Sequence, residues 1–226
     1  MAFLKFIKKV RNAQNVFSFI FEAPDDFKWI AGQFIQVTFP HDNPDERGIK
    51  RFFSISSAPF EKNVMITTRF DNHNGSSFKK AFYDISAGSL VESTLPRGKF
   101  IAMKQDKKII FIAGGIGITP VRSIILDLGY NHKLNNIDIL YSNRDEDIPF
   151  KEEFENRKSE STFFNIYYFV NPVSICEETL NKIYDVFPDC YAYLSGPPAM
   201  IKNIADLLSS KGITEDNIKT DYFPGY

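Results

Sequence analysis

The stretch IIFIAGGIGITPVRSIILDL, residues 109–128, decides the fold class of this chain. Its apolar start has the length of a buried strand, glycines follow it, and Pro120 then opens an amphipathic run. Proline suits the first position of a helix, and Thr119 is a good cap before it. We therefore predict a strand, a glycine turn and a helix whose first N–H groups face any ligand over the turn, which favours phosphate.

This glycine turn departs from the standard nucleotide-binding patterns. Read from Gly115 it gives Gly-x-Gly-x-x-Pro, where the dinucleotide fingerprint has a third glycine. No GxxxxGK[ST] occurs, which excludes a P-loop, and a purely structural tight turn stays an alternative. A second turn of the same kind, SGPPAM at 195–200, follows another apolar run. Two such turns at strand ends of one sheet would face the same crevice.

Working outward, the second half of the chain alternates apolar strands with amphipathic helices. Repeated β-α-β units with short connections are typical of a doubly wound parallel sheet with helices on both faces. The expected strands are 108–113, 137–141, 164–170, 191–194 and 218–223, and the expected helices are 120–128, 150–157, 177–186 and 198–209.

The first hundred residues indicate β structure instead. Short runs alternate apolar and polar residues, and clusters of turn-forming residues separate them. We predict an antiparallel β-barrel domain over 1–104 and an α/β domain over 105–226. The expected elements of the barrel are strands at 16–22, 34–39, 64–69 and 90–94, a further strand in KRFFSISSAP at 50–59, and a short helix at 79–85.

Composition excludes several classes of function. The 226 residues are 43% hydrophobic, enough for a sizeable core, and 27 basic against 28 acidic residues argue against nucleic-acid binding. No apolar run approaches the roughly 20 residues of a membrane-spanning helix. Lysines interrupt the apolar N-terminus too early for a signal peptide. We expect a cytoplasmic monomer without membrane insertion.

The reactive side chains exclude further classes. Cys176 and Cys190 are too few for a four-thiolate iron–sulfur cluster or a disulfide scaffold, and we expect buried free thiols. The three histidines are scattered without metal-ligand spacing, so no metal site is expected. Neither Ser54 nor Ser195 lies in a GxSxG elbow, which disfavours a serine nucleophile.

The barrel half also carries candidate binding residues. Within 50–59, Arg51 offers a cation, Phe53 an aromatic face and Ser54 a hydroxyl, so an anion and a flat ring could both be served. Further donors follow, and a glycine with two serines before a short helix suits an anion cradle. An ordinary strand and a polar hairpin loop are the alternatives. These donors are Thr68, Arg69, Gly75, Ser76 and Ser77.

Five features follow one another along the chain: RFFS at 51–54, GSS at 75–77, GGIGITP at 114–120, SGPPAM at 195–200 and an aromatic C-terminal strand. In this order they resemble the ferredoxin–NADP reductase family of flavoproteins, and the resemblance covers essentially the whole chain. The resemblance implies a barrel that binds FAD and an α/β domain that binds NAD(P). It implies an enzyme that passes hydride from NAD(P)H to flavin N5, then single electrons to a separate acceptor. That acceptor would be a ferredoxin, a flavodoxin, a partner domain or a small molecule.

The resemblance also implies a role for each motif residue. Arg51 would pair with the FAD pyrophosphate, Phe53 would lie against the flavin, and Ser54 would sit near N5. Phe52 completes that motif, and Gly75, Ser76 and Ser77 would hold the pyrophosphate from the other side. The NAD(P) phosphates would bind at Gly114, Gly115, Gly117, Thr119 and Pro120, and the ribose and nicotinamide would lie beside Ser195, Gly196, Pro197, Pro198 and Met200.

The end of the chain implies a cover for the flavin. Phe223 or Tyr226 would lie over the ring until nicotinamide displaces it, and a frayed terminus is the alternative. The predicted catalytic residues are Ser54, Ser195 and Tyr226.

Two departures and the choice of nucleotide complete the prediction. Phe53 stands where the family usually has Tyr, and Ser195 where many members have Cys. Ser142 and Arg144 would lie near the adenosine ribose, where Arg144 favours NADPH slightly and the acids at 145–147 oppose it. Two alternatives remain: a non-catalytic flavin- or nucleotide-binding module, and an α/β enzyme without flavin.

Overall fold

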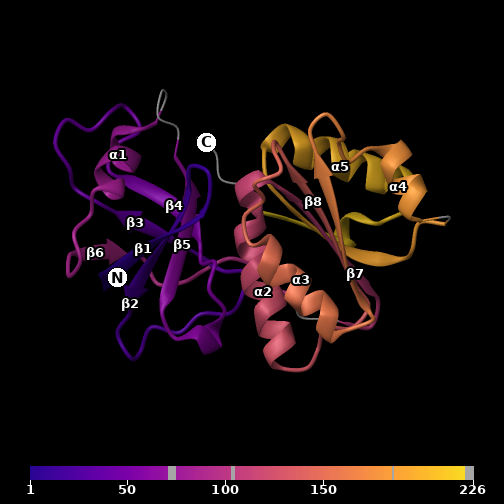
Figure 1. The fold of residues 1–226 in the computed structure, drawn as a ribbon, viewed down its shortest axis with the longest axis horizontal. Coiled ribbons are helices and arrows are strands. Elements are labelled where there is room, and N and C mark those ends of the chain that lie inside the picture. Colours follow the sequence, from indigo (N-terminus) through magenta and orange to yellow (C-terminus); the bar gives the residue numbers. More distant parts are fainter. Residues whose placement is uncertain (71–74, 103–104, 185, 222–226) are drawn as a thin grey trace.

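A computed structural model of the chain describes residues 1–70, 75–102, 105–184 and 186–221. Its strands form two sheets that lie side by side (Figure 1). The first sheet comes from the first hundred residues and the second from the remainder, as the sequence predicts. The predicted boundary between 104 and 105 adjoins residues outside the described part, so it stays a prediction.

The first sheet is antiparallel and closes into a barrel. Its edge strands approach each other through a bridge between Ile55 and Ile66. The core is mainly aromatic, with Phe19 and Phe21 packed against Phe82 of the short helix. In sheet order the elements are β4 (Lys50–Ser54), β3 (Phe34–Thr38), β6 (Leu90–Ser93), β1 (Ala2–Ala13), β2 (Val16–Glu22) and β5 (Val64–Arg69), with helix α1 at Ser77–Tyr83 and a 3-10 turn, η1, at Pro59–Glu61.

The second sheet is parallel throughout, which confirms the doubly wound α/β prediction. Helices α2 and α3 cover the face that looks toward the barrel, and α4 and α5 cover the other face (Figure 1). In sheet order the strands are β11 (Ile218–Asp221), β10 (Cys190–Ser195), β7 (Lys108–Gly114), β8 (Ile137–Asn143) and β9 (Phe164–Val170), and the helices are α2 (Ile118–Tyr130), α3 (Lys151–Glu160), α4 (Glu177–Ile183) and α5 (Pro198–Ser210), with a 3-10 turn, η3, at Glu215–Asn217.

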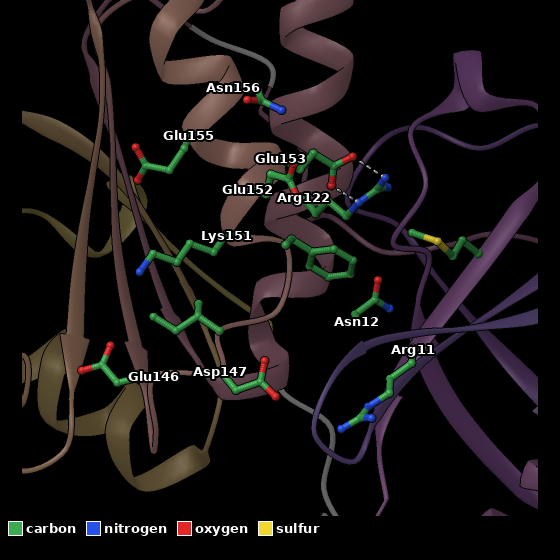
Figure 2. A pocket seen from close by; sticks show the side chains of 13 residues that line it. Arg11, Asn12, Arg122, Glu146, Asp147, Lys151, Glu152, Glu153, Glu155 and Asn156 are labelled. Carbon is green, nitrogen blue, oxygen red and sulfur yellow. Dashed lines mark hydrogen bonds and ion pairs between the residues drawn. The ribbon is translucent and has the colours of Figure 1, made fainter.

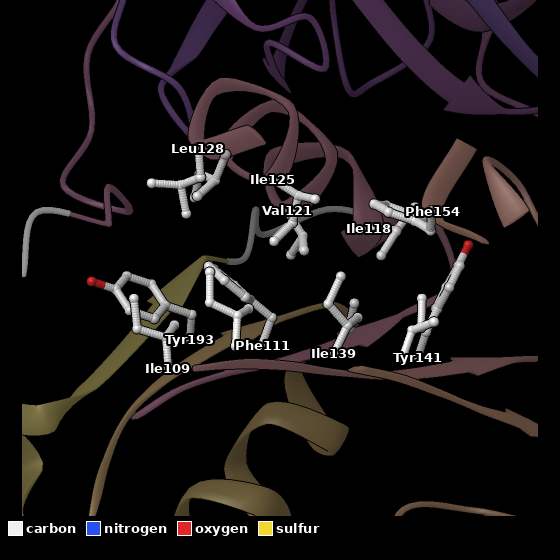
Figure 3. Packing of buried hydrophobic residues seen from close by; sticks show 14 of the residues in the cluster. Ile109, Phe111, Ile118, Val121, Ile125, Leu128, Ile139, Tyr141, Phe154 and Tyr193 are labelled. Atoms are coloured by element: carbon white, nitrogen blue, oxygen red, sulfur yellow. The ribbon is translucent and has the colours of Figure 1, made fainter. Parts of the chain in front are cut away.

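Apolar packing fixes α2 over the sheet. Val121 and Ile125 of α2 point down onto Phe111 of the central strand β7 and Ile139 of its neighbour β8 (Figure 3). All four side chains are fully buried. Because α2 begins at the glycine turn, this packing also fixes the position of the turn at the edge of the sheet.

Two local predictions are wrong. Thr119 is not the helix cap, because a 3-10 turn, η2 (Gly115–Gly117), runs directly into α2 and makes Gly117 the cap. The Thr119 hydroxyl instead donates to the Ile116 carbonyl from inside the first turn. The sequence patterns also missed β1, whose alternation is broken by a bulge between Phe6 and Lys8.

The remaining structural expectations concern cysteines, metals and membranes. Cys190 is buried as predicted, and Cys176 is half-buried. Within the described ranges, no three metal-ligating side chains gather into a cluster. None of the helices in those ranges has the length and apolar character to cross a membrane.

Candidate functional site at the junction of the two sheets

The carboxyl ends of the parallel strands meet at one edge of the second sheet. There Ser195 is the register partner of both Ala113 and Asp221, and Gly114 is the partner of Ser142. Neighbouring strands lie about 4.8 Å apart, so Asp221, Ser195 and Ala113 form one row. Gly114 and Ser142 lie one residue beyond that row. In open α/β sheets ligands bind beyond such an edge. The two predicted turns therefore lie next to each other at this edge, and the shared crevice stays a prediction.

Glycine is required where the two turns pack on each other. A Cβ added to Gly117 would lie 2.4 Å from the Ser195 carbonyl oxygen, and one on Gly196 would lie 3.0 Å from the Gly114 nitrogen. A Cβ on Gly114 would lie 2.6 Å from the sulfur of Met200. These glycines let the turns touch. Pro198 opens α5 as predicted, and Pro197 is its cap.

Gly115 has a different environment. Its φ of 53° lies in the left-handed region, and an added Cβ would meet nothing within 4 Å. Gly115 therefore borders open space directly before the N-terminus of α2, where backbone N–H groups and the helix dipole favour an anion. This combination fits a phosphate of a bound nucleotide.

One carboxylate joins the two halves at the same edge. The Ser54 hydroxyl donates a 3.1 Å hydrogen bond to Oδ2 of Asp221, and both side chains are more than nine-tenths buried. Burial raises the Asp221 pKa from 3.8 to about 6, although the Ser54 hydrogen bond works against the rise. Ser54 of the barrel and Ser195 of the α/β half thus flank one acid.

Asp221 was not among the residues singled out from the sequence. A lone acid near the C-terminus carries no local pattern. Its partner Ser54 lies 167 residues earlier in the chain, so only the folded structure reveals the contact.

The predicted pyrophosphate residues Arg51 and Ser77 meet around a second carboxylate. Asp45 Oδ2 accepts a 2.9 Å hydrogen bond from the Ser77 amide, and Oδ1 lies 3.6 Å from the Arg51 guanidinium. Hydrogen bonds from the Arg47 side chain and then the Ser77 backbone lower the Asp45 pKa to about 2. An oxyanion already occupies the space between these donors, so their chemistry suits a diphosphate.

The other barrel residues are engaged within the protein. Phe53 lies in the core, stacked 5.9 Å from Phe82 at 14°, so its ring is covered here. Phe52 packs edge-on against Phe34 at 5.8 Å. The Ser76 hydroxyl caps α1 by accepting from the Lys79 amide. Their roles toward a flavin stay predictions, as does that of the half-buried Gly75.

Arg69 links the barrel to the nucleotide edge. Its Nη2 donates to Oδ1 of Asn143 at 3.4 Å, directly beside Ser142 and the exposed Arg144. Thr68 is buried and faces Phe17 in the ladder. Phe223 and Tyr226, the predicted flavin covers, lie outside the described residues.

Comparisons with known proteins agree with this architecture. The family model of the oxidoreductase NAD-binding domain matches residues 111–206. One component of the Na(+)-translocating NADH-quinone reductase of Haemophilus influenzae is 27% identical over 78% of this chain and 49% of its own. The phthalate 4,5-dioxygenase reductase component of Pseudomonas putida is 29% identical over 90% and 62%. The chain thus spans about half the length of the NADH-quinone reductase relatives that it matches.

Solved structures match both halves at once. The FAD/NAD-binding domain of nitric oxide dioxygenase from Vibrio cholerae superposes with a TM-score of 0.81, 18% identity and 98% of both chains covered. Ferredoxin–NADP+ reductase from Plasmodium falciparum gives a TM-score of 0.80 and 19% identity over 98% of this chain and 95% of its own. Residues 111–206 thus match the oxidoreductase NAD-binding domain family, and the whole chain has the fold of ferredoxin–NADP reductase-like structures.

Proposed function

We propose that this chain is a flavin-dependent NAD(P)H reductase that passes electrons to a separate acceptor. The observation that carries the proposal lies at one sheet edge. There Ser195 pairs with Asp221, the Ser54 hydroxyl of the barrel donates to Asp221, and Gly115 borders open space before α2. A nucleotide bound beyond that edge would lie close to the barrel at this junction. The family relatives named above include reductases and reductase components, which supports the same class of activity.

The residues of this chain would hold and orient the two cofactors. Arg51 and the Ser77 amide would bind the FAD diphosphate after Asp45 moves aside, and Gly115 with the start of α2 would bind the nucleotide phosphates. Ser54 and Ser195 would orient the reacting rings from opposite halves. When bound, the flavin supplies the chemistry by accepting a hydride from reduced nicotinamide and releasing its electrons singly.

Asp221 would hold or release a proton during the transfer between nicotinamide and flavin. Hydride transfer itself delivers no proton, so a group near the ring would have to supply one wherever the reduced flavin is neutral. A buried carboxyl whose pKa is near 6 holds or releases a proton close to neutral pH, and Ser54 connects it to the junction. Asp221 is therefore proposed as a proton reservoir rather than a ligand.

The acceptor lies outside these residues. Two cysteines cannot bind a four-thiolate cluster within this chain. A ferredoxin, a flavodoxin, a partner domain or a small molecule would take the electrons. We propose FAD as the flavin and NADPH as the slightly preferred nucleotide, because Arg144 is an exposed cation beside Ser142.

The visible spectrum of the purified, FAD-supplemented protein tests this function. We expect a bound flavin whose absorbance bleaches under anaerobic conditions when NADPH or NADH is added. Chromatography of the released cofactor identifies FAD or FMN. Bound flavin that neither nucleotide bleaches would instead support a non-catalytic binding module, and no bound flavin would leave an α/β enzyme that works without it.

A further inference from the structure

Arg122 of α2 uses every donor of its guanidinium to join three elements. Its Nε and Nη2 donate to the Glu153 carboxylate of α3 at 2.7 Å each. Its Nη1 and Nη2 donate to the Glu61 carboxylate of η1 at 2.9 and 3.0 Å, and Nη1 also donates to the Ser56 carbonyl at 2.7 Å. An arginine side chain has five N–H donors, and all five are used here.

The clamp formed by Arg122, Glu61 and Glu153 is a buried and charged structure. Arg122 is only 5% exposed. Burial alone would lower the Arg122 pKa, but the hydrogen bonds and charges of Glu61 and Glu153 outweigh it and raise the pKa. The guanidinium thus stays charged, and a fork of this kind fixes direction as well as distance.

The position of the clamp connects it to the candidate site. Glu61 and Ser56 belong to the segment that follows Ser54, on the barrel side. Arg122 lies in the second turn of α2, shortly after the glycine turn. Helix α3 follows the end of β8, where Ser142 and Arg144 lie. One guanidinium therefore links the flavin side of the proposed site to both nucleotide-binding loops.

The clamp lies beside a groove between the two halves of the molecule. A groove of about 820 Å³ separates the halves beside it, and both Arg122 and Glu153 line that groove (Figure 2). Arg11 and Asn12 border the groove from the barrel, opposite Lys151 and Glu152 of α3. Beside this groove the clamp connects the two halves. The neighbouring Ser123 hydroxyl adds a second connection by donating to the Ser57 carbonyl at 2.6 Å.

We propose that Arg122 is a positioning residue for the transfer between nucleotide and flavin: through Glu61 it fixes the barrel relative to α2, and so the spacing of Ser54 and Ser195. This inference rests on the proposed function. Transfer rates fall steeply when reacting groups move by about 1 Å, by on the order of 100-fold. Loss of the clamp should therefore slow transfer while each half keeps its own binding residues.

Three variants separate positioning from general stability. Arg122→Met keeps an unbranched apolar stem but removes the fork, and Arg122→Lys keeps the charge with fewer donors. Glu61→Gln weakens the branch to Glu61, which crosses the junction, and leaves the branch to Glu153 in place. Arg157→Met is the matched control, because Arg157 forms its ion pair with Glu160 inside α3.

Two readouts are compared. In anaerobic rapid mixing, Arg122→Met and Arg122→Lys should slow flavin bleaching by about 10- to 100-fold, and Glu61→Gln by several-fold, while the Kd values for flavin and nucleotide change less than about 2-fold. The second readout is the distance between spin labels at Lys8→Cys on β1 and Lys202→Cys on α5, in a Cys176→Ser background without any cofactor. The distribution of this distance should be broader in the Arg122 and Glu61 variants than in the parent. The Arg157→Met control should match the parent in both readouts.

The outcomes are distinct. An unchanged label distance together with an unchanged bleaching rate in Arg122→Met would overturn the inference, as would equal losses in Arg157→Met. If Arg122→Met does not fold, Arg122→Lys and Glu61→Gln decide by the same criteria. A parent protein that binds no flavin would contradict the proposed function, whereas the label distances would still test the clamp.

Discussion

At the residue scale, two aspartates of opposite character mark the candidate site. Asp45 is held as a charged carboxylate by Arg47 and Ser77, and its pKa is about 2. Asp221 is buried beside Ser54, and its pKa is about 6. One group behaves as a fixed anion among donors, and the other as an acid that titrates near neutrality. Different substitutions therefore test them.

Asp221→Asn should stabilise the protein near pH 7. The folded state holds the Asp221 proton up to about pH 6, whereas the unfolded state releases it near pH 3.8, so stability falls as pH rises between these values. The difference corresponds to about 3 kcal/mol at most. We expect a gain of about 1–3 kcal/mol in the free energy of unfolding near pH 7 and none below about pH 4. Urea titrations check this, with the exposed Asp216→Asn as control; a gain independent of pH contradicts it.

Asp45→Asn should tighten flavin binding. The Asp45 carboxylate competes with a diphosphate for Arg51 and the Ser77 amide. Because the pair is partly exposed, we expect the flavin Kd to fall only about 2- to 5-fold. Arg51→Ala should instead raise it by more than about 10-fold. Fluorescence titration measures both, and weaker binding by Asp45→Asn would show that Asp45 supports the cradle.

Arg144→Ala tests the choice of nucleotide. The Arg144 side chain is exposed at the loop after β8, where a 2′-phosphate would gain an ionic partner. We expect the KM for NADPH to rise about 10-fold more than the KM for NADH. Steady-state kinetics with both nucleotides measure this, with Arg157→Ala as control. Equal effects on the two KM values would remove Arg144 from the phosphate site.

At the element scale, the sequence predicted an element correctly where the residues that define it are contiguous. The strand, glycine turn and helix at 109–128 could be predicted because apolar run, glycines and proline are contiguous. The cap of α2 was assigned wrongly to Thr119, because the 3-10 turn η2 contains two glycines and continues directly into α2. Local residue propensities do not reveal such a continuation. β1 was missed because its bulge and its exposed lysines hide the alternation.

Gly117→Ala tests the contact between the two glycine turns. The added Cβ would lie 2.4 Å from the Ser195 carbonyl oxygen, and backbone atoms cannot yield easily. We expect a loss of about 1–3 kcal/mol in stability and a weaker Kd for NAD(P)H. Gly129→Ala in α2 is the control, because its closest neighbour is a flexible Leu134 methyl and alanine favours helices. Unchanged nucleotide affinity in a folded Gly117→Ala would show that the turns bind no phosphate.

At the scale of the whole molecule, the two halves are joined at points that no sequence pattern reveals. Ser54 meets Asp221, Arg69 meets Asn143, and Arg122 meets Glu61. Each pair unites residues distant in the chain, whereas pattern analysis sees only neighbours. The predicted motifs contain Ser54 and Ser195, and only the folded structure shows that Asp221 lies between them.

The most direct test of the central claim follows a single turnover. The protein loaded with flavin is mixed anaerobically with NAD(P)H that carries hydrogen or deuterium at the transferred position. If hydride crosses from nicotinamide to flavin at the Ser54–Asp221–Ser195 junction, the flavin absorbance should bleach, and deuterium at the transferred position should slow the bleaching. A flavin that stays oxidised with either nucleotide would contradict the account.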